Sequence, residues 1–216
     1  FKYGSFAVNA GDQVYRLTEE IRTELARLGA TGDLDRFPPV LAFQSVVDAT
    51  VSTSALVSGL FKHLPASRHE LVLFDINRNS EIERLLVKDP GPTLKSMLQD
   101  PDLGFTLTLI TNANEDSSRV VSLQNHSDGS APGRTPLELE WPRHIYSLAH
   151  VALPFPANDP LYGVEEEEQS PGIRLGSLAP RGEKGVLQVP AADMLRQRWN
   201  PFYGYLEQRV LEFMNL

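Results

Sequence analysis

The sequence predicts an α/β fold in which parallel strands are joined by a crossover helix. Two short apolar runs, residues 40–43 and 70–76, have the composition of strands that are buried on both faces. A helical pattern lies between them, so the three segments form one βαβ unit, for which a right-handed crossover is expected. A later pair of strands predicts an added segment of short helices and a β-hairpin.

An amphipathic helix precedes the first strand. From Asp12 onwards, apolar residues recur at spacings of three and four, as they do along one face of an α-helix. These residues are Val14, Leu17, Ile21, Leu25 and Leu28. Gly29 follows as the expected C-terminal cap, because glycine readily adopts the left-handed backbone that ends many helices.

Two more helices are predicted from the same spacing. Ser52 or Thr53 caps the crossover helix, and Pro65 marks its end. Its apolar side consists of Leu56, Val57, Leu60, Phe61 and Leu64. A C-terminal helix is expected from about Ala192, with a kink at Pro201.

Residues 80–144 are predicted to be an insertion that forms a lid or wall of a pocket. Ser80 and Glu83 have the spacing of a capping box before a short helix, and a second short helix is expected around 94–98. Residues 105–111 alternate apolar residues with threonine, the pattern of a half-exposed strand. A polar turn then leads to a second strand near 120–123, so a hairpin is expected.

Composition excludes several classes of partner and cofactor. The 216 residues carry a net charge of −8, so a nucleic acid is not an expected partner. Cysteine is absent, which excludes thiolate catalysis and Cys-ligated zinc and leaves the compartment undetermined. No apolar run is long enough for a membrane span. The acidic run Glu165–Glu168 lacks the spacing of a calcium loop, so neither a metal nor a cofactor is predicted.

Asp48 is the first candidate catalytic residue. It follows a predicted parallel strand at its carboxyl end, where open α/β sheets place catalytic groups. Residues 38–75, PPVLAFQSVVDATVSTSALVSGLFKHLPASRHELVLFD, resemble the stretch of α/β-hydrolases in which the triad acid follows a late strand. The resemblance implies that Asp48 is this acid. The alternative is that Asp48 only caps the helix that follows.

His150 is the second candidate. In the family, the order along the chain is nucleophile, acid and histidine, so the resemblance implies a base C-terminal to Asp48. The histidines that follow are His63, His69, His126, His144 and His150. Only His150 lies in an apolar segment followed by a proline-rich loop, as expected for an oriented and partly desolvated base. The alternative is a buried structural histidine.

The nucleophile of the triad is not in this chain. A nucleophile elbow requires G-x-S-x-G, and this motif does not occur. The resemblance implies that residues 1–216 are the C-terminal half of one α/β-hydrolase domain, and that the missing N-terminal half supplies the serine. We expect the chain alone to be inactive, and its apolar strands to need that half as a partner.

With the serine present, the site is expected to cleave carboxylic esters through an acyl-enzyme, with a small ester or a lipid-like molecule as substrate. Leu98, Leu103 and Phe105 would suit an apolar acyl group, although core packing explains them equally well. Two alternatives stay open. One is a non-catalytic α/β-hydrolase-like binding module, and the other is an unrelated parallel-sheet domain in which Asp48 and His150 lie far apart.

Overall fold

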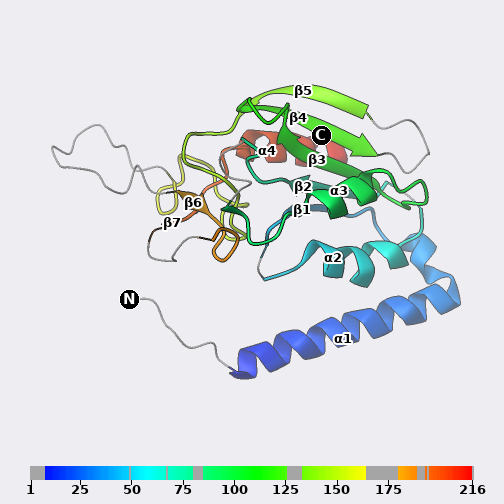
Figure 1. The fold of residues 1–216 in the computed structure, drawn as a ribbon. Helices are drawn as coiled ribbons and strands as arrows, with labels where there is room; N and C mark the ends of the chain where they lie inside the picture. The colour runs from blue at the N-terminus through cyan, green and yellow to red at the C-terminus, as the bar shows by residue number, and fades with distance from the viewer. Residues whose placement is uncertain are drawn as a thin grey trace.

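The computed structural model describes residues 8–48, 50–66, 68–79, 85–125, 133–163, 180–188, 193 and 195–215. Within these ranges the chain is a mixed α/β protein with one central sheet, which confirms the predicted class at this level (Figure 1). The predicted helix start at Ser80, His126 and the acidic run Glu165–Glu168 lie outside the described residues.

The central sheet has five strands in the order β1-β2-β3-β4-β5 among the described residues. They are β1 (Leu41–Ser45), β2 (Glu70–Phe74), β3 (Thr106–Asn112), β4 (Arg119–Asn125) and β5 (Gly133–Glu140). The first three are parallel to one another, and β4 and β5 continue the sheet by antiparallel pairing. The parallel part brings the carboxyl ends of β1, β2 and β3 to one edge.

Helices cover both faces of this sheet (Figure 1). The helices α2 (Thr53–Gly59), η2 (Phe61–His63) and α3 (Gly91–Leu98) pack on the face that includes Leu71 and Leu73. The opposite face, with Val72 and Phe74, packs against Phe202 at the start of α4 (Tyr203–Met214). All of β2 is buried because its alternate side chains point into these two cores. The predicted strand–helix–strand unit is thus β1–α2–β2.

β3 lies inside the sheet rather than in a peripheral hairpin. Its threonines led us to expect a half-exposed strand, but six of its seven residues are buried. The hydroxyl of Thr108 donates to Glu70 Oε1 at 3.1 Å, and the hydroxyl of Thr111 donates to Asp75 Oδ2 at 2.8 Å. These buried carboxylates replace the water that the threonines were expected to contact. β3, β4 and β5 therefore extend the main sheet.

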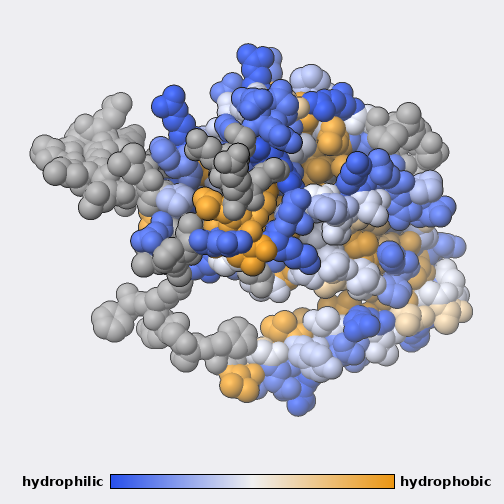
Figure 2. All heavy atoms as spheres, in the orientation of Figure 1, coloured by the Kyte–Doolittle hydropathy of each residue, from blue (hydrophilic) through white to orange (hydrophobic). Residues whose placement is uncertain are grey.

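The N-terminal helix α1 (Val8–Thr31) extends past the predicted cap Gly29, and Gly32, with φ of 76°, follows its end. A short helix, η1 (Asp33–Arg36), comes next. Leu25 packs with Leu34 and Leu64, but the remaining apolar stripe is exposed, with Val14, Leu17 and Ile21 at 62%, 60% and 47%. In Figure 2 the N-terminal part of α1 stands away from the rest of the protein.

The C-terminal helix begins later than predicted. Residues near the expected start instead form β7 (Leu195–Arg196), which pairs in parallel with β6 (Arg181–Gly182). Pro201 lies before α4, where its missing N–H group costs no helical hydrogen bond, so the expected kink does not form. None of the helices in the described residues combines the length and apolar character needed to cross a membrane.

An ion pair attaches α4 to the sheet. The Glu70 side chain, in β2, is only 3% exposed, and its two carboxylate oxygens accept hydrogen bonds from Arg209 of α4. These hydrogen bonds raise the pKa of Arg209. Because the Glu70 carboxylate is buried, the charged form of this side chain depends on Arg209 for stabilisation.

Replacing Arg209 with methionine should lower the free energy of unfolding by about 3 kcal/mol, because it leaves the buried Glu70 carboxylate without its cation. Arg119→Met is the matched control. Its pair with Glu140 is exposed and spans 4.0 Å, so its loss should cost less than about 1 kcal/mol. Urea denaturation of both variants measures the difference, and equal losses would contradict this role for Glu70.

His69 links the residues that directly precede β1 and β2. The Val40 amide donates to His69 Nδ1 at 3.0 Å, and the His69 side chain is buried. Burial lowers the pKa of His69, because the protonated ring is poorly solvated there. A protonated ring would also lose its acceptor for the Val40 amide.

The unfolded chain therefore binds a proton at His69 more readily than the folded chain does. Stability should fall as pH drops below about 6.5, the ordinary pKa of histidine, and continue to fall until the lower folded pKa is passed. His69→Gln keeps an acceptor but removes this titration. Its free energy of unfolding should fall less than that of the wild type between about pH 7 and about pH 5. Parallel pH curves for the two proteins would exclude this effect.

Candidate catalytic site

The strand ends of the parallel sheet hold the segment that carries His150. The hydroxyl of Ser45, the last residue of β1, donates to the Leu148 carbonyl at 2.8 Å. The amide of Asn77, just beyond β2, donates to the Tyr146 carbonyl at 2.6 Å. Leu148 and Ala149 are fully buried. His150 thus follows a fixed backbone at the carboxyl edge of the sheet, as predicted for a functional group of this fold class.

The imidazole of His150 is bound by a buried carboxylate. Its Nδ1 atom lies 2.7 Å from Oε2 of Glu183, and the backbone amide of His150 donates to the same oxygen at 3.1 Å. Because a carboxylate only accepts hydrogen bonds, Nδ1 carries the proton in this contact. The neutral ring then presents Nε2 as an acceptor, and the side chain is 25% exposed. One ring nitrogen is fixed and the other is accessible.

Several contacts fix the position of Glu183 itself. Its side chain is 1% exposed, and Oε1 accepts the Lys184 amide at 2.9 Å and lies 3.8 Å from the Arg196 guanidinium. The Glu183 amide donates to Ser147 Oγ at 3.0 Å, and the Tyr146 hydroxyl donates to the Glu183 carbonyl at 2.5 Å. Burial raises the pKa of Tyr146, so this hydroxyl stays a donor.

The loop after β1 lies beside the exposed side of the ring. Thr50 Oγ1 is 3.3 Å from His150 Nε2. The Asp48 carboxylate shapes this loop, since its Oδ1 accepts the amides of Thr50 at 2.7 Å and Val51 at 3.0 Å. The structure therefore brings the Asp48 loop, through Thr50, beside His150.

The partner of Nδ1 differs from the sequence-based prediction. We expected Asp48 to orient the ring, but Glu183 takes that position, and no hydrogen bond joins the described residues Asp48 and His150. The physical reason is that two amides of its own loop already hold the Asp48 carboxylate, as in the capping alternative. Glu183 escaped the sequence reasoning because no motif or periodicity marks it.

Other candidate residues are either paired with another side chain or exposed. Asp75, which directly follows β2, forms a buried ion pair with Arg78 at 2.9 Å. His63 and His144 are exposed, and His144 has a φ of 64°. No group of three or more His, Asp or Glu side chains within the described residues is placed to hold a metal ion.

Comparison with protein-family models, with curated proteins and with solved structures found no match.

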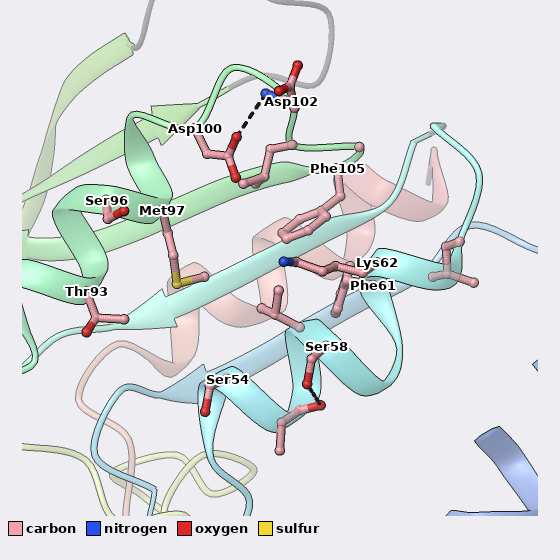
Figure 3. A pocket seen from close by; sticks show the side chains of 15 residues that line it. Ser54, Ser58, Phe61, Lys62, Thr93, Ser96, Met97, Asp100, Asp102 and Phe105 are labelled. Carbon is pink, nitrogen blue, oxygen red and sulfur yellow. Dashed lines mark hydrogen bonds between the residues drawn. The ribbon is translucent and has the colours of Figure 1, made fainter.

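Two exposed valines and two cavities lie in this part of the protein. Val51 and Val151, next to Thr50 and His150, are exposed at 48% and 37%. A cavity of about 510 Å³ is lined on one side by the Asp48 loop and on the other by the segment that follows Glu183. A second cavity of about 980 Å³ lies between α2 and α3 (Figure 3). Leu103 and Phe105 line it, whereas Leu98 packs against the core.

Gly182 allows the Glu183 segment to lie against the segment that carries His150. A Cβ atom at this position would overlap the Tyr146 ring and lie 2.6 Å from Ser147 Oγ. A side chain here would therefore push Glu183 away from its position beside Nδ1.

Gly182→Ala should lower the free energy of unfolding by about 1 to 3 kcal/mol through this overlap. Gly204→Ala is the matched control, because open space surrounds Gly204 in α4 and alanine favours a helix by up to about 1 kcal/mol. Thermal or urea unfolding compares the two variants. If Gly182→Ala were as stable as Gly204→Ala, the close packing of the two segments would be refuted.

Proposed function

We propose that His150 and Glu183 are the base and the acid of a serine hydrolase site that cleaves carboxylic esters through an acyl-enzyme. The observation that supports this is the buried carboxylate at 2.7 Å from Nδ1, combined with a partly exposed ring whose Nε2 lies beside a hydroxyl, that of Thr50. A catalytic triad uses this arrangement of acid and base. The serine comes from a polypeptide segment outside these 216 residues.

In the proposed reaction, His150 Nε2 removes the proton from the serine hydroxyl as the oxygen attacks the ester carbonyl. Glu183 stabilises the imidazolium that forms and keeps the ring oriented. The imidazolium then returns the proton to the leaving alcohol, and the same base activates water to hydrolyse the acyl-enzyme. The serine hydroxyl would approach Nε2 on the side of the ring where Thr50 Oγ1 lies 3.3 Å away. Asp48 is a positioning residue for this loop.

Thr50 itself is a poorer nucleophile candidate. The amides of Thr50 and Val51 both donate to Asp48. They are therefore engaged and do not supply the free N–H groups that an oxyanion next to Thr50 requires. A serine from another segment, with its own oxyanion amides, fits the geometry better.

Among the described residues, β1 and β5 are the edge strands of the sheet, and only β5 carries residues that discourage pairing with a further strand. β5 has Pro136, Glu138 and Glu140, which discourage pairing with another strand, whereas β1, with the sequence LAFQS, has no charge or proline at its edge. α1 also leaves Val14, Leu17 and Ile21 exposed. We propose that the segment with the serine adds a strand to the edge of β1 and packs against the exposed apolar side chains of α1.

The test is to express the protein together with the sequences that flank these residues in its gene, and to measure fluorophosphonate labelling and p-nitrophenyl ester hydrolysis. His150→Ala should reduce kcat/KM on the order of a thousandfold or more. Glu183→Gln should reduce it on the order of a hundredfold to ten-thousandfold, because the ring loses its fixed tautomer.

Two further variants make the test specific. Asp48→Asn should cost less activity than Glu183→Gln, and a larger loss would return the acid to Asp48. Thr50→Ala should keep fluorophosphonate labelling, and abolished labelling would make Thr50 the nucleophile. A folded protein that neither labels nor hydrolyses esters would favour the alternative, a binding module without catalysis.

A further inference from the structure

Two lysines line the cavity next to the Glu183 segment. The Val87 amide donates to the Val186 carbonyl at 2.9 Å, and Leu86 bridges Leu187 in antiparallel register. This register brings the chain around Lys88 alongside the chain around Gly185. Both lysines line the cavity of about 510 Å³.

The charge of this lining is positive. In the described part of the chain, neither lysine has an ion-pair partner, and Asp89, the neighbour of Lys88, is bound to Arg78 at 2.8 Å. Asp48 is the third charged residue of the lining, and two amides already engage its carboxylate. Two lysines and one aspartate give a net charge of +1 on a chain whose net charge is −8. Such a local reversal of sign favours an anion.

The same cavity contains an unsatisfied hydroxyl. Thr53 Oγ1 is buried and has no hydrogen-bond partner, and Thr53 lines the cavity with Ser54 and Thr93. A buried polar group without a partner is unfavourable, so such groups commonly bind a ligand or water. Together with the lysines, these hydroxyls provide donors suited to a carboxylate or a phosphate.

The cavity between α2 and α3 continues from this one, and apolar side chains line part of it. The two linings share Ser54, Thr93 and Met97. Figure 3 shows Phe61, Met97 and Phe105 pointing into the space between the helices. The volume of about 980 Å³ lies in the range of small-molecule sites.

The charge differs between the two cavities. In the cavity between the helices, the charged residues are Lys62, Asp100 and Asp102, with a net charge of −1. Figure 3 places the two aspartates on the side of this cavity opposite Ser54. An anionic group is therefore repelled from that side and attracted to Lys88 and Lys184, which gives an amphiphilic ligand one preferred orientation.

We propose that the two cavities form one cleft that binds an amphiphile, with its carboxylate or phosphate at Lys88 and Lys184 and its apolar chain between α2 and α3. That this ligand is also the substrate rests on the proposed function, because the cleft begins beside Asp48 and Lys184, the neighbour of Glu183. Binding itself does not depend on catalysis.

The experiment is isothermal titration of the protein with dodecanoate, dodecyl phosphate and dodecanol, each below its micelle-forming concentration. Both anions should bind at least about tenfold more tightly than the alcohol, the effect of one charge-assisted hydrogen bond. The tighter of the two anions identifies the head group. Butanoate should bind more weakly than dodecanoate, because it cannot reach the cavity between the helices.

The double substitution Lys88→Met and Lys184→Met keeps the length of both side chains and removes their charge. It should weaken anion binding by about tenfold or more and leave dodecanol binding unchanged. Lys95→Met is the control, since this lysine is exposed on α3 and lines neither cavity. Equal binding of the three probes, or undiminished anion binding by the double variant, would overturn the proposal.

The experiments distinguish a failure of the proposed hydrolase from a failure of the proposed ligand cleft. If Glu183→Gln loses ester hydrolysis but still binds dodecanoate, both proposals are supported. A protein that binds dodecanoate through the lysines without hydrolysing esters would retain the cleft and lose the proposed hydrolase.

Discussion

The candidate site depends on the need of one buried carboxylate for partners. A carboxylate removed from water is unstable unless hydrogen-bond donors or cations surround it. Glu183 meets this need with the His150 ring, the His150 and Lys184 amides and the nearby Arg196 guanidinium. The contacts that stabilise Glu183 also fix the orientation of the imidazole. The stability of the buried carboxylate and the orientation of the His150 ring thus arise from the same set of contacts.

The parallel sheet supplies the rigid frame for this pair. The end of β1 binds the histidine segment through Ser45, and the chain beyond β2 binds it through Asn77, whose side chain donates to the Ile145 carbonyl at 3.1 Å. Parallel strands end at one edge, so two neighbouring strands hold one short segment. The ring of His150 consequently follows a backbone fixed from two sides, and Gly182 lets the acid approach it closely.

Local sequence patterns predicted those elements of the fold whose surroundings depend on residues close by in the sequence. The apolar strands β1 and β2, the crossover helix, α3 and the β3–β4 hairpin all follow from periodicity and composition. The place of β3 did not, because its threonines are satisfied by Glu70 and Asp75, which lie more than thirty residues away in sequence. Periodicity also marked the apolar stripe of α1 but did not indicate what covers it.

The same limit applies to the site. His150 was found because it is the one histidine in an apolar segment before a stiff loop, a local signal. Glu183 lies 33 residues further along the chain, and only tertiary structure places it at Nδ1. Asp48 was placed correctly at a strand end. Its two amide partners, however, lie within its own loop, and this short-range choice cannot be separated from a catalytic role by sequence alone.

Nitrogen-15 NMR of the His150 ring tests the central claim, that Glu183 fixes the tautomer of this histidine. We predict that the neutral ring of the wild-type protein carries its proton on Nδ1 and not on Nε2, with a slowly exchanging Nδ1 proton. Glu183→Gln should lose this pattern, whereas Asp48→Asn should retain it. Loss of the pattern in Asp48→Asn and its retention in Glu183→Gln would contradict the account.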